Sequence, residues 1–131
     1  MTEQRELFND LAEDAKCLLS ALEPVVRKAE EICFIIESAE REDPSGMQPF
    51  MWETLGSMQL SIRRCETLAK ETKNITFDLS KESWTTIVKS MMTVKDPLSR
   101  FRAKLESSRH AFLLLNTLVQ KQVVNSHTRY V

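Results

Sequence analysis

Met-Thr-Val-Lys-Asp-Pro-Leu-Ser-Arg-Phe-Arg-Ala-Lys-Leu-Glu-Ser-Ser-Arg-His-Ala-Phe-Leu-Leu-Leu-Asn-Thr-Leu-Val, residues 92–119, is the stretch of sequence that decides the fold. Asp96 can cap a helix, and Pro97 suits the first helical position, where its missing N–H costs nothing. Apolar or small residues then recur three or four positions apart, at Leu98, Phe101, Leu105, Ser108, Phe112, Leu115 and Val119. This spacing predicts a long helix over residues 96–124 that packs one face in a bundle.

The same spacing runs through the N-terminal third of the chain. Its apolar and small positions are Phe8, Leu11, Ala15, Leu18, Leu22, Val25, Ala29, Ile32, Ile36 and Ala39. Pro24 interrupts the backbone but leaves the stripe in register, and an interior proline removes a helical hydrogen bond. The sequence therefore predicts either one kinked helix over about residues 5–42 or two helices that meet at Pro24.

A clear break follows at residues 43–49, Asp-Pro-Ser-Gly-Met-Gln-Pro, where proline and glycine mark a turn. A second helix is predicted over residues 48–73, with its stripe at Met51, Leu55, Met58, Ile62, Cys65, Ala69 and Thr72. Residues 73–83 are rich in β-branched and capping residues, which favours a loop. We expect a short helix over residues 84–94, beginning at Trp84, and a non-helical tail over residues 125–131.

Length and composition agree with an all-α protein. A chain of 131 residues is long enough for a core without metal or disulfide crosslinks, and two glycines and four prolines leave little room for hairpins. No segment alternates as a strand does. Residues 1–131 are therefore expected to form a single domain, an antiparallel helical bundle of four to five helices.

The charge and the apolar content of the chain bear on whether it binds nucleic acid or membranes. The net charge is −1, from 18 basic and 19 acidic residues spread along the chain, so we expect no nucleic-acid surface and no strong attraction to anionic lipid. The longest charge-free apolar stretch, residues 110–120, is too short to span a bilayer. The N-terminus is charged and has no apolar leader segment. These features predict a cytoplasmic protein.

The sequence contains few residues in patterns that are typical of catalytic or metal sites. Glycine occurs only at Gly46 and Gly56, so a phosphate-binding loop is not expected. Glu106 and His110 lie four residues apart and can share a helix face, but no second histidine pair exists, and we expect His110 to be a boundary residue. The sequence predicts no enzyme, no cofactor and no metal.

Cysteine, methionine and tryptophan residues are expected in the core. Cys17, Cys33 and Cys65 show no zinc-ligand spacing and are predicted to be small buried residues in a reducing compartment. The methionines, with Trp52 and Trp84, fall mostly on or beside the apolar stripes. They predict core packing, with a partner or ligand groove as the alternative.

The last long helix carries the one charged surface that stands out. Its basic residues are Arg100, Arg102, Lys104 and Arg109. They predict either an ordinary solvated face, balanced by Glu106 and the acidic N-terminal segment, or a basic surface that docks a protein partner.

A family resemblance follows from three features of this chain. A long helix runs from Leu55 through Cys65 to Leu68, and a loop with Trp84 comes after it. The final helix then has the form Pro97-Leu98-x-x-Phe101-x-x-x-Leu105-x-x-x-Arg109-x-x-Phe112-x-Leu114-Leu115. Over residues 25–122 the chain resembles the HeLo-like N-terminal helical domain of fungal NOD-like (STAND) receptors. That domain is similar in shape to the four-helix domain of the mixed-lineage kinase-like pseudokinase.

The resemblance implies a helical signalling or death-inducing module that is attached to a sensor region, self-associates and carries no catalytic residues. In several members of the family the domain also acts on membranes. The first helix of this chain is charged, with Glu3, Arg5, Glu6, Asp10 and Glu13 within its first turns, which disfavours insertion into a membrane.

We therefore expect a non-enzymatic interaction module that binds a protein partner or a second copy through its helices. A membrane-permeabilising bundle, and a small helical enzyme or ligand-binding protein with a pocket between helices, are the alternatives. Continuation of the natural chain past Val131 into a further domain would favour a receptor module, whereas a natural end there would favour the stand-alone alternatives.

Overall fold

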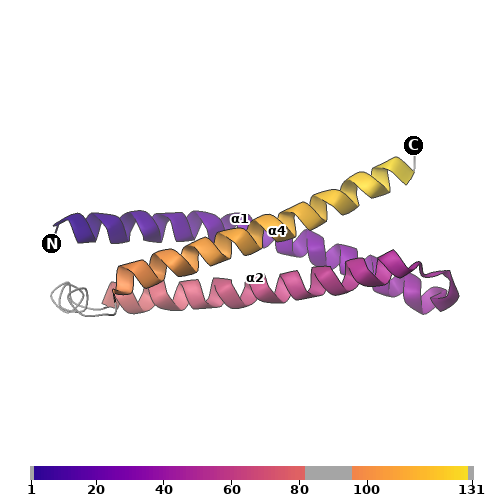
Figure 1. The fold of residues 1–131 in the computed structure, drawn as a ribbon, viewed down its shortest axis with the longest axis horizontal. Coiled ribbons are helices and arrows are strands. Elements are labelled where there is room, and N and C mark those ends of the chain that lie inside the picture. The colour runs from indigo at the N-terminus through magenta and orange to yellow at the C-terminus, as the bar shows by residue number, and fades with distance from the viewer. Residues whose placement is uncertain (1, 82–95, 130–131) are drawn as a thin grey trace. The chain divides into compact units, whose positions relative to one another are not determined.

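A computed structural model describes the backbone of residues 2–81 and 96–129, and the side chains of residues 3–81 and 96–123. The described chain is all-α (Figure 1). It contains the helices α1 (Thr2–Glu42), α2 (Pro49–Lys81) and α4 (Pro97–Arg129), with a single 3-10 turn, η1 (Pro44–Gly46), after α1. The described residues thus hold three α-helices rather than the expected four to five. The short helix predicted over residues 84–94 lies outside the described residues.

Helix α1 is continuous through Pro24, so of the two arrangements that the sequence left open the structure has the single helix. Proline at this position leaves the carbonyl of Ser20 without its helical N–H partner. Ser20 and Pro24 are both exposed, and water can therefore bond this carbonyl. An ion pair between Arg27 and Glu23, one helical turn apart, lies beside the proline on the same exposed surface. The helix therefore tolerates the proline because no buried polar group is left unsatisfied.

The turn between α1 and α2 forms where proline and glycine predicted it. Asp43 accepts a hydrogen bond from the Gly46 N–H at 3.2 Å and another from the Ser45 hydroxyl at 2.8 Å. A side chain at Gly46 would meet this carboxylate, because its Cβ would lie 2.5 Å from Asp43 Oδ2. Helix α2 then begins at Pro49, as expected.

Helix α2 continues to Lys81, so the loop predicted for residues 73–83 was wrong over residues 73–81. The hydroxyl groups of two threonines in and beside this polar segment bond carbonyls of the preceding turn. Thr72 Oγ1 donates to the Leu68 carbonyl at 2.7 Å, and Thr76 Oγ1 donates to the Thr72 carbonyl at 2.8 Å. Leu79, near the end of the segment, is buried. Burial of this leucine stabilises the helix where local propensity is weak.

Helix α4 begins as its sequence predicts. Asp96 Oδ1 accepts from the Leu98 N–H at 3.0 Å, and Asp96 Oδ2 accepts from the Ser99 hydroxyl at 2.7 Å. Pro97 occupies the first helical position. The helix runs to Arg129, beyond the predicted end at residue 124, so the expected tail was wrong over residues 125–129. No glycine or proline occurs after Pro97 to stop it.

The chain divides into two compact units, each built from a part of all three helices. The first unit comprises the described residues of Met1–Ser20 and Thr67–His110, and the second comprises those of Ala21–Glu66 and Ala111–Val131. In the first unit α1 and α4 run in the same direction and α2 runs opposite to both (Figure 1). Each unit has its own set of buried side chains.

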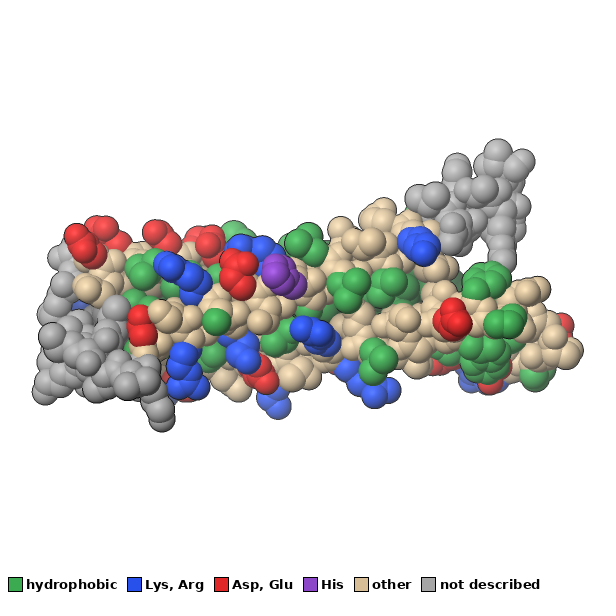
Figure 2. Space-filling view, in the orientation of Figure 1, with side chains coloured by type: hydrophobic (Ala, Val, Ile, Leu, Met, Phe, Trp, Pro, Cys, Tyr) green, Lys and Arg blue, Asp and Glu red, His purple; other side chains and the backbone are tan. Residues whose placement is uncertain are grey.

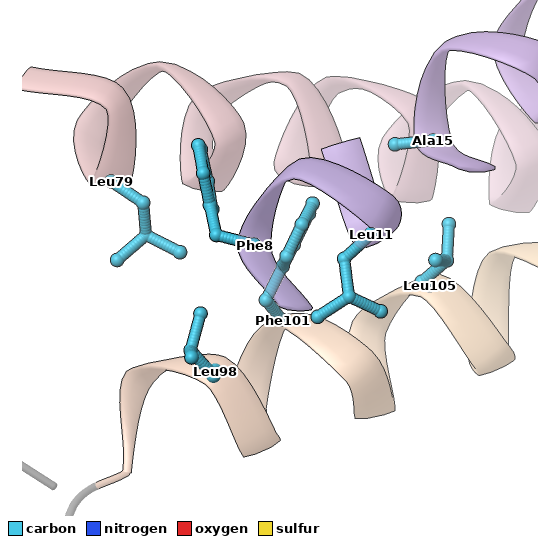
Figure 3. Packing of buried hydrophobic residues seen from close by; sticks show 7 residues of the cluster. All are labelled: Phe8, Leu11, Ala15, Leu79, Leu98, Phe101 and Leu105. Carbon is cyan, nitrogen blue, oxygen red and sulfur yellow. The ribbon is translucent and has the colours of Figure 1, made fainter. Parts of the chain in front are cut away.

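The core of the first unit joins the predicted stripes of α1 and α4 to Leu79 of α2, which lies in the segment predicted to be a loop (Figure 3). Its buried members are Phe8, Leu11, Ala15, Leu79, Leu98, Phe101 and Leu105. The rings of Phe8 and Phe101 pack at a centroid distance of 6.2 Å and are tilted by 37°. This contact joins the start of α1 to the start of α4, which fixes the parallel register of the two helices.

The second unit buries a second set of apolar side chains. Helix α1 contributes Leu22, Ala29, Cys33 and Ile36; α2 contributes Leu55, Met58, Ile62 and Cys65; α4 contributes Ala111, Leu115 and Val119. Gln59 Nε2 of α2 donates to Glu37 Oε1 of α1 at 2.9 Å beside this core. Phe112 of the predicted stripe is only half-buried and Ala111 takes its place, because a helix of 3.6 residues per turn drifts from a strict seven-residue repeat.

Candidate interaction surfaces

The four basic residues predicted to form a docking surface do not share one face of α4. Arg100 and Lys104 are four residues apart and lie on one side of the helix, whereas Arg102 and Arg109 are seven apart and lie on the other. Between the two sides runs the buried stripe that contains Phe101 and Leu105. A partner helix cannot contact all four residues along one line.

Two of these basic residues are already paired within the first unit. Lys104 Nζ lies 2.6 Å from Glu71 Oε2 of α2, and both side chains are partly exposed. Arg109 Nη1 lies 3.0 Å from Glu106 Oε1 on the same helix. These pairs favour the solvated-face interpretation for Lys104 and Arg109. Such exposed pairs add little stability, about 0.2–1 kcal/mol each.

Exposed large apolar side chains are concentrated in the second unit. Phe34 and Ile35 on α1 are 64% and 65% exposed, and Leu60 on α2 is 66% exposed. The neighbouring pair Leu113 and Leu114 on α4 is about half exposed. Phe50, Trp52 and Val123 of the same unit are also exposed. The first unit, by contrast, exposes only one described residue of this kind, Phe77.

These positions lie on the outer sides of their helices. Phe34 and Ile35 lie between the buried residues Cys33 and Ile36, and a helix turns by about 100° per residue, so two successive side chains between buried neighbours point outward. Sequence periodicity predicted the buried stripes, but it did not predict that Phe34 and Ile35 would be exposed. Trp52, predicted to pack in the core on or beside the apolar stripe of α2, is 44% exposed, so this expectation was wrong. Trp84 lies outside the described residues.

The candidate histidine site is not assembled. His110 is exposed, and Glu106, its predicted neighbour, bonds Arg109 instead. Within residues 2–81 and 96–129, no group of three or more His, Cys, Asp and Glu side chains has the geometry to hold a metal ion. The helix face that carries Glu106 and His110 therefore presents an ion pair and a solvated imidazole.

The cysteines occupy two different environments. Cys33 and Cys65 are buried, as expected, whereas Cys17 is exposed, so the prediction of burial was wrong for Cys17. Burial raises the pKa of the Cys33 thiol, with Glu37 and Glu30 raising it further. Burial also raises the pKa of the Cys65 thiol to about 11, although Arg64 opposes the shift. Both buried thiols are thus poor nucleophiles at neutral pH.

Comparison of this chain with protein-family models, with curated proteins and with solved structures found no match. In the part of the chain that the structure describes, no helix has an apolar run long enough to cross a membrane.

Proposed function

We propose that this chain is a non-enzymatic helical interaction module that acts in the cytoplasm through helix-mediated association. The observation that carries the proposal is the exposure of large apolar side chains on the second unit, above all Phe34, Ile35, Leu60, Leu113 and Leu114. Exposed apolar side chains in such number are typical of surfaces that bind another protein. The sequence resemblance to HeLo-like domains supports a role in signalling or programmed cell death, as the N-terminal domain of a NOD-like receptor.

The chemistry of these residues favours a protein partner. Aromatic and aliphatic side chains contribute most of the binding free energy when a partner encloses them and excludes water. Helix α1 carries exposed carboxylates at Glu3, Glu6, Asp10 and Glu13, and their burial in hydrocarbon would be costly, which weighs against membrane permeabilisation. The exposed His110, without a second catalytic group beside it, weighs against an enzyme.

Light scattering at about 1 M salt tests the proposal, because surface charges are screened at that ionic strength and apolar contacts remain. We expect the wild-type chain to associate with itself or with a candidate partner domain. The variant Phe34→Ser/Ile35→Ser/Leu113→Ser/Leu114→Ser should lose this association. Phe77→Ser, which removes an exposed aromatic ring from the first unit, is the matched control and should retain it. A wild-type chain that stays monomeric and binds no partner would refute the proposal.

A further inference from the structure

The first unit exposes two charged surfaces of opposite sign on different helices. On α1, four carboxylates follow one another at intervals of three, four and three residues, and we call them the acidic stripe: Glu3, Glu6, Asp10 and Glu13. On α2, residues at intervals of three, four and four form the basic stripe: Lys70, Lys73, Phe77 and Lys81. Residues at these intervals are neighbours on one helix surface. All eight side chains are exposed.

Each stripe contains charges of one sign only. In Figure 2 acidic side chains gather along the N-terminal part of α1, and basic side chains gather along α2. Within the described residues no ion pair joins α1 to α2 in the first unit, and none of the seven charged members of the stripes takes part in an ion pair. The charges that do pair in this unit, such as Lys104 with Glu71, lie outside both stripes.

The two stripes also match in length. Glu3 to Glu13 spans ten residues, or about 15 Å along the helix, and Lys70 to Lys81 spans eleven, or about 16 Å, at 1.5 Å per residue. Phe77 adds an apolar surface to the basic stripe, since its side chain is 57% exposed. The ammonium of Lys81 lies 4.2 Å from the centre of the Phe77 ring, which holds this cation on the stripe.

We infer that the acidic stripe of one copy docks on the basic stripe of a second copy of this chain. This inference rests on the proposed function, which is helix-mediated association. It adds that the partner is a second copy of the chain and that the two stripes form the contact. Among the described residues of a single chain neither stripe has an ion-pair partner, because the stripes lie on the exposed sides of different helices. Two chains can pair four carboxylates with three ammonium groups over the same length. The contact is heterologous, because the two surfaces that meet differ.

Charge reversal tests this pairing. In Glu6→Lys/Asp10→Lys the α1 stripe loses its acidic character, and in Lys70→Glu/Lys81→Glu the α2 stripe loses its basic character. Sedimentation velocity at about 0.01 M salt, where the Debye length is about 30 Å, measures association of each chain. We expect the wild type to associate more strongly at this ionic strength than at about 1 M salt, and each variant to lose this salt-dependent part of the association.

The decisive experiment mixes Glu6→Lys/Asp10→Lys with Lys70→Glu/Lys81→Glu. In an equimolar mixture the intact acidic stripe of Lys70→Glu/Lys81→Glu meets the intact basic stripe of Glu6→Lys/Asp10→Lys, so we expect the mixture to associate. Glu30→Lys/Glu42→Lys changes the net charge as much as Glu6→Lys/Asp10→Lys does, at exposed positions outside the stripes, and it should associate like the wild type. Failure of the mixture to associate, or an equal loss in this control, would overturn the inference. Apolar association at about 1 M salt, where these charges are screened, is a separate result that tests the proposed function alone.

Discussion

The hydroxyl oxygens of Thr72 on α2 and Ser108 on α4 lie 2.9 Å apart inside the first unit, where both residues are buried. Thr72 gives its single hydroxyl proton to the Leu68 carbonyl, so Ser108 is the donor between the two hydroxyl groups. Ser108 Oγ also lies 3.5 Å from the same carbonyl. One carbonyl and two hydroxyl groups thus form a closed polar group among apolar side chains, which links α2 to α4 in one register.

The first prediction is that this polar group is stabilising as a unit. Thr72→Val and Ser108→Ala should each lower the free energy of unfolding by about 1–2 kcal/mol, because each leaves a buried hydroxyl or carbonyl with a lost partner. The double variant should lose less than the sum, since it removes both hydroxyl groups together. Urea unfolding of the four chains measures this coupling. Strictly additive losses would show that the two hydroxyl groups do not act together.

A second prediction concerns Phe101, which is fully buried against Phe8. Phe101→Ala should lower the free energy of unfolding by about 3–5 kcal/mol, because it removes a large core side chain and leaves a cavity. Leu113→Ala, on the same helix but half exposed, should change it by less than about 0.5 kcal/mol. Thermal and urea unfolding compare the two variants. Equal losses would contradict the assignment of these side chains to core and surface.

Apolar periodicity predicted most of this core but not its limits. Phe8, Leu11, Ala15 and Leu98 were expected on buried stripes, and they are buried. Apolar residues recur regularly at these positions because each helix must bury one face against two neighbouring helices. The end of α2 was missed, because its helix depends on the burial of Leu79, which local propensity does not report.

The surfaces were harder to predict than the core. Arg100, Arg102, Lys104 and Arg109 are close in sequence, but the turn of the helix places them in two pairs on different sides of α4. The ion-pair partner of Lys104 is Glu71, which is far away in sequence. The exposed residues Phe34 and Ile35 follow a buried cysteine directly. Their hydrophobicity alone suggests the core, and only the packed structure shows that they point outward.

The third prediction is a pH dependence that arises at the start of α4. The hydrogen bond from the Ser99 hydroxyl, partly offset by burial and assisted by backbone hydrogen bonds, lowers the pKa of Asp96 below its usual 3.8. A carboxyl group with a lowered pKa stabilises the folded state above its unfolded pKa, and this contribution is lost as the pH falls through the folded value. The cap should therefore stabilise the protein at neutral pH and weaken below about pH 4.

Two substitutions separate the charge of this cap from its hydrogen bonds. Asp96→Ala should lower the free energy of unfolding by about 1 kcal/mol at neutral pH, since the Leu98 N–H loses its acceptor. Asp96→Asn keeps a side-chain oxygen that can accept this bond but does not titrate, so it should lose less at neutral pH and show a weaker dependence in acid. Chemical unfolding across this pH range measures both effects. An unchanged acid profile in Asp96→Asn would assign the dependence to other carboxyl groups.

The last prediction follows from the contrast between the exposed Cys17 and the buried Cys33 and Cys65. A chromogenic disulfide reagent at pH 8 should label one thiol of the folded chain quickly, because Cys17 is exposed, whereas Cys33 and Cys65 are buried and burial raises the pKa of both thiols. The other two thiols should react only as the protein opens, so their rate should follow the unfolding equilibrium. Cys17→Ser should abolish the fast phase and leave the slow phase unchanged, whereas a slow phase that matched the fast one would place Cys33 or Cys65 at the surface.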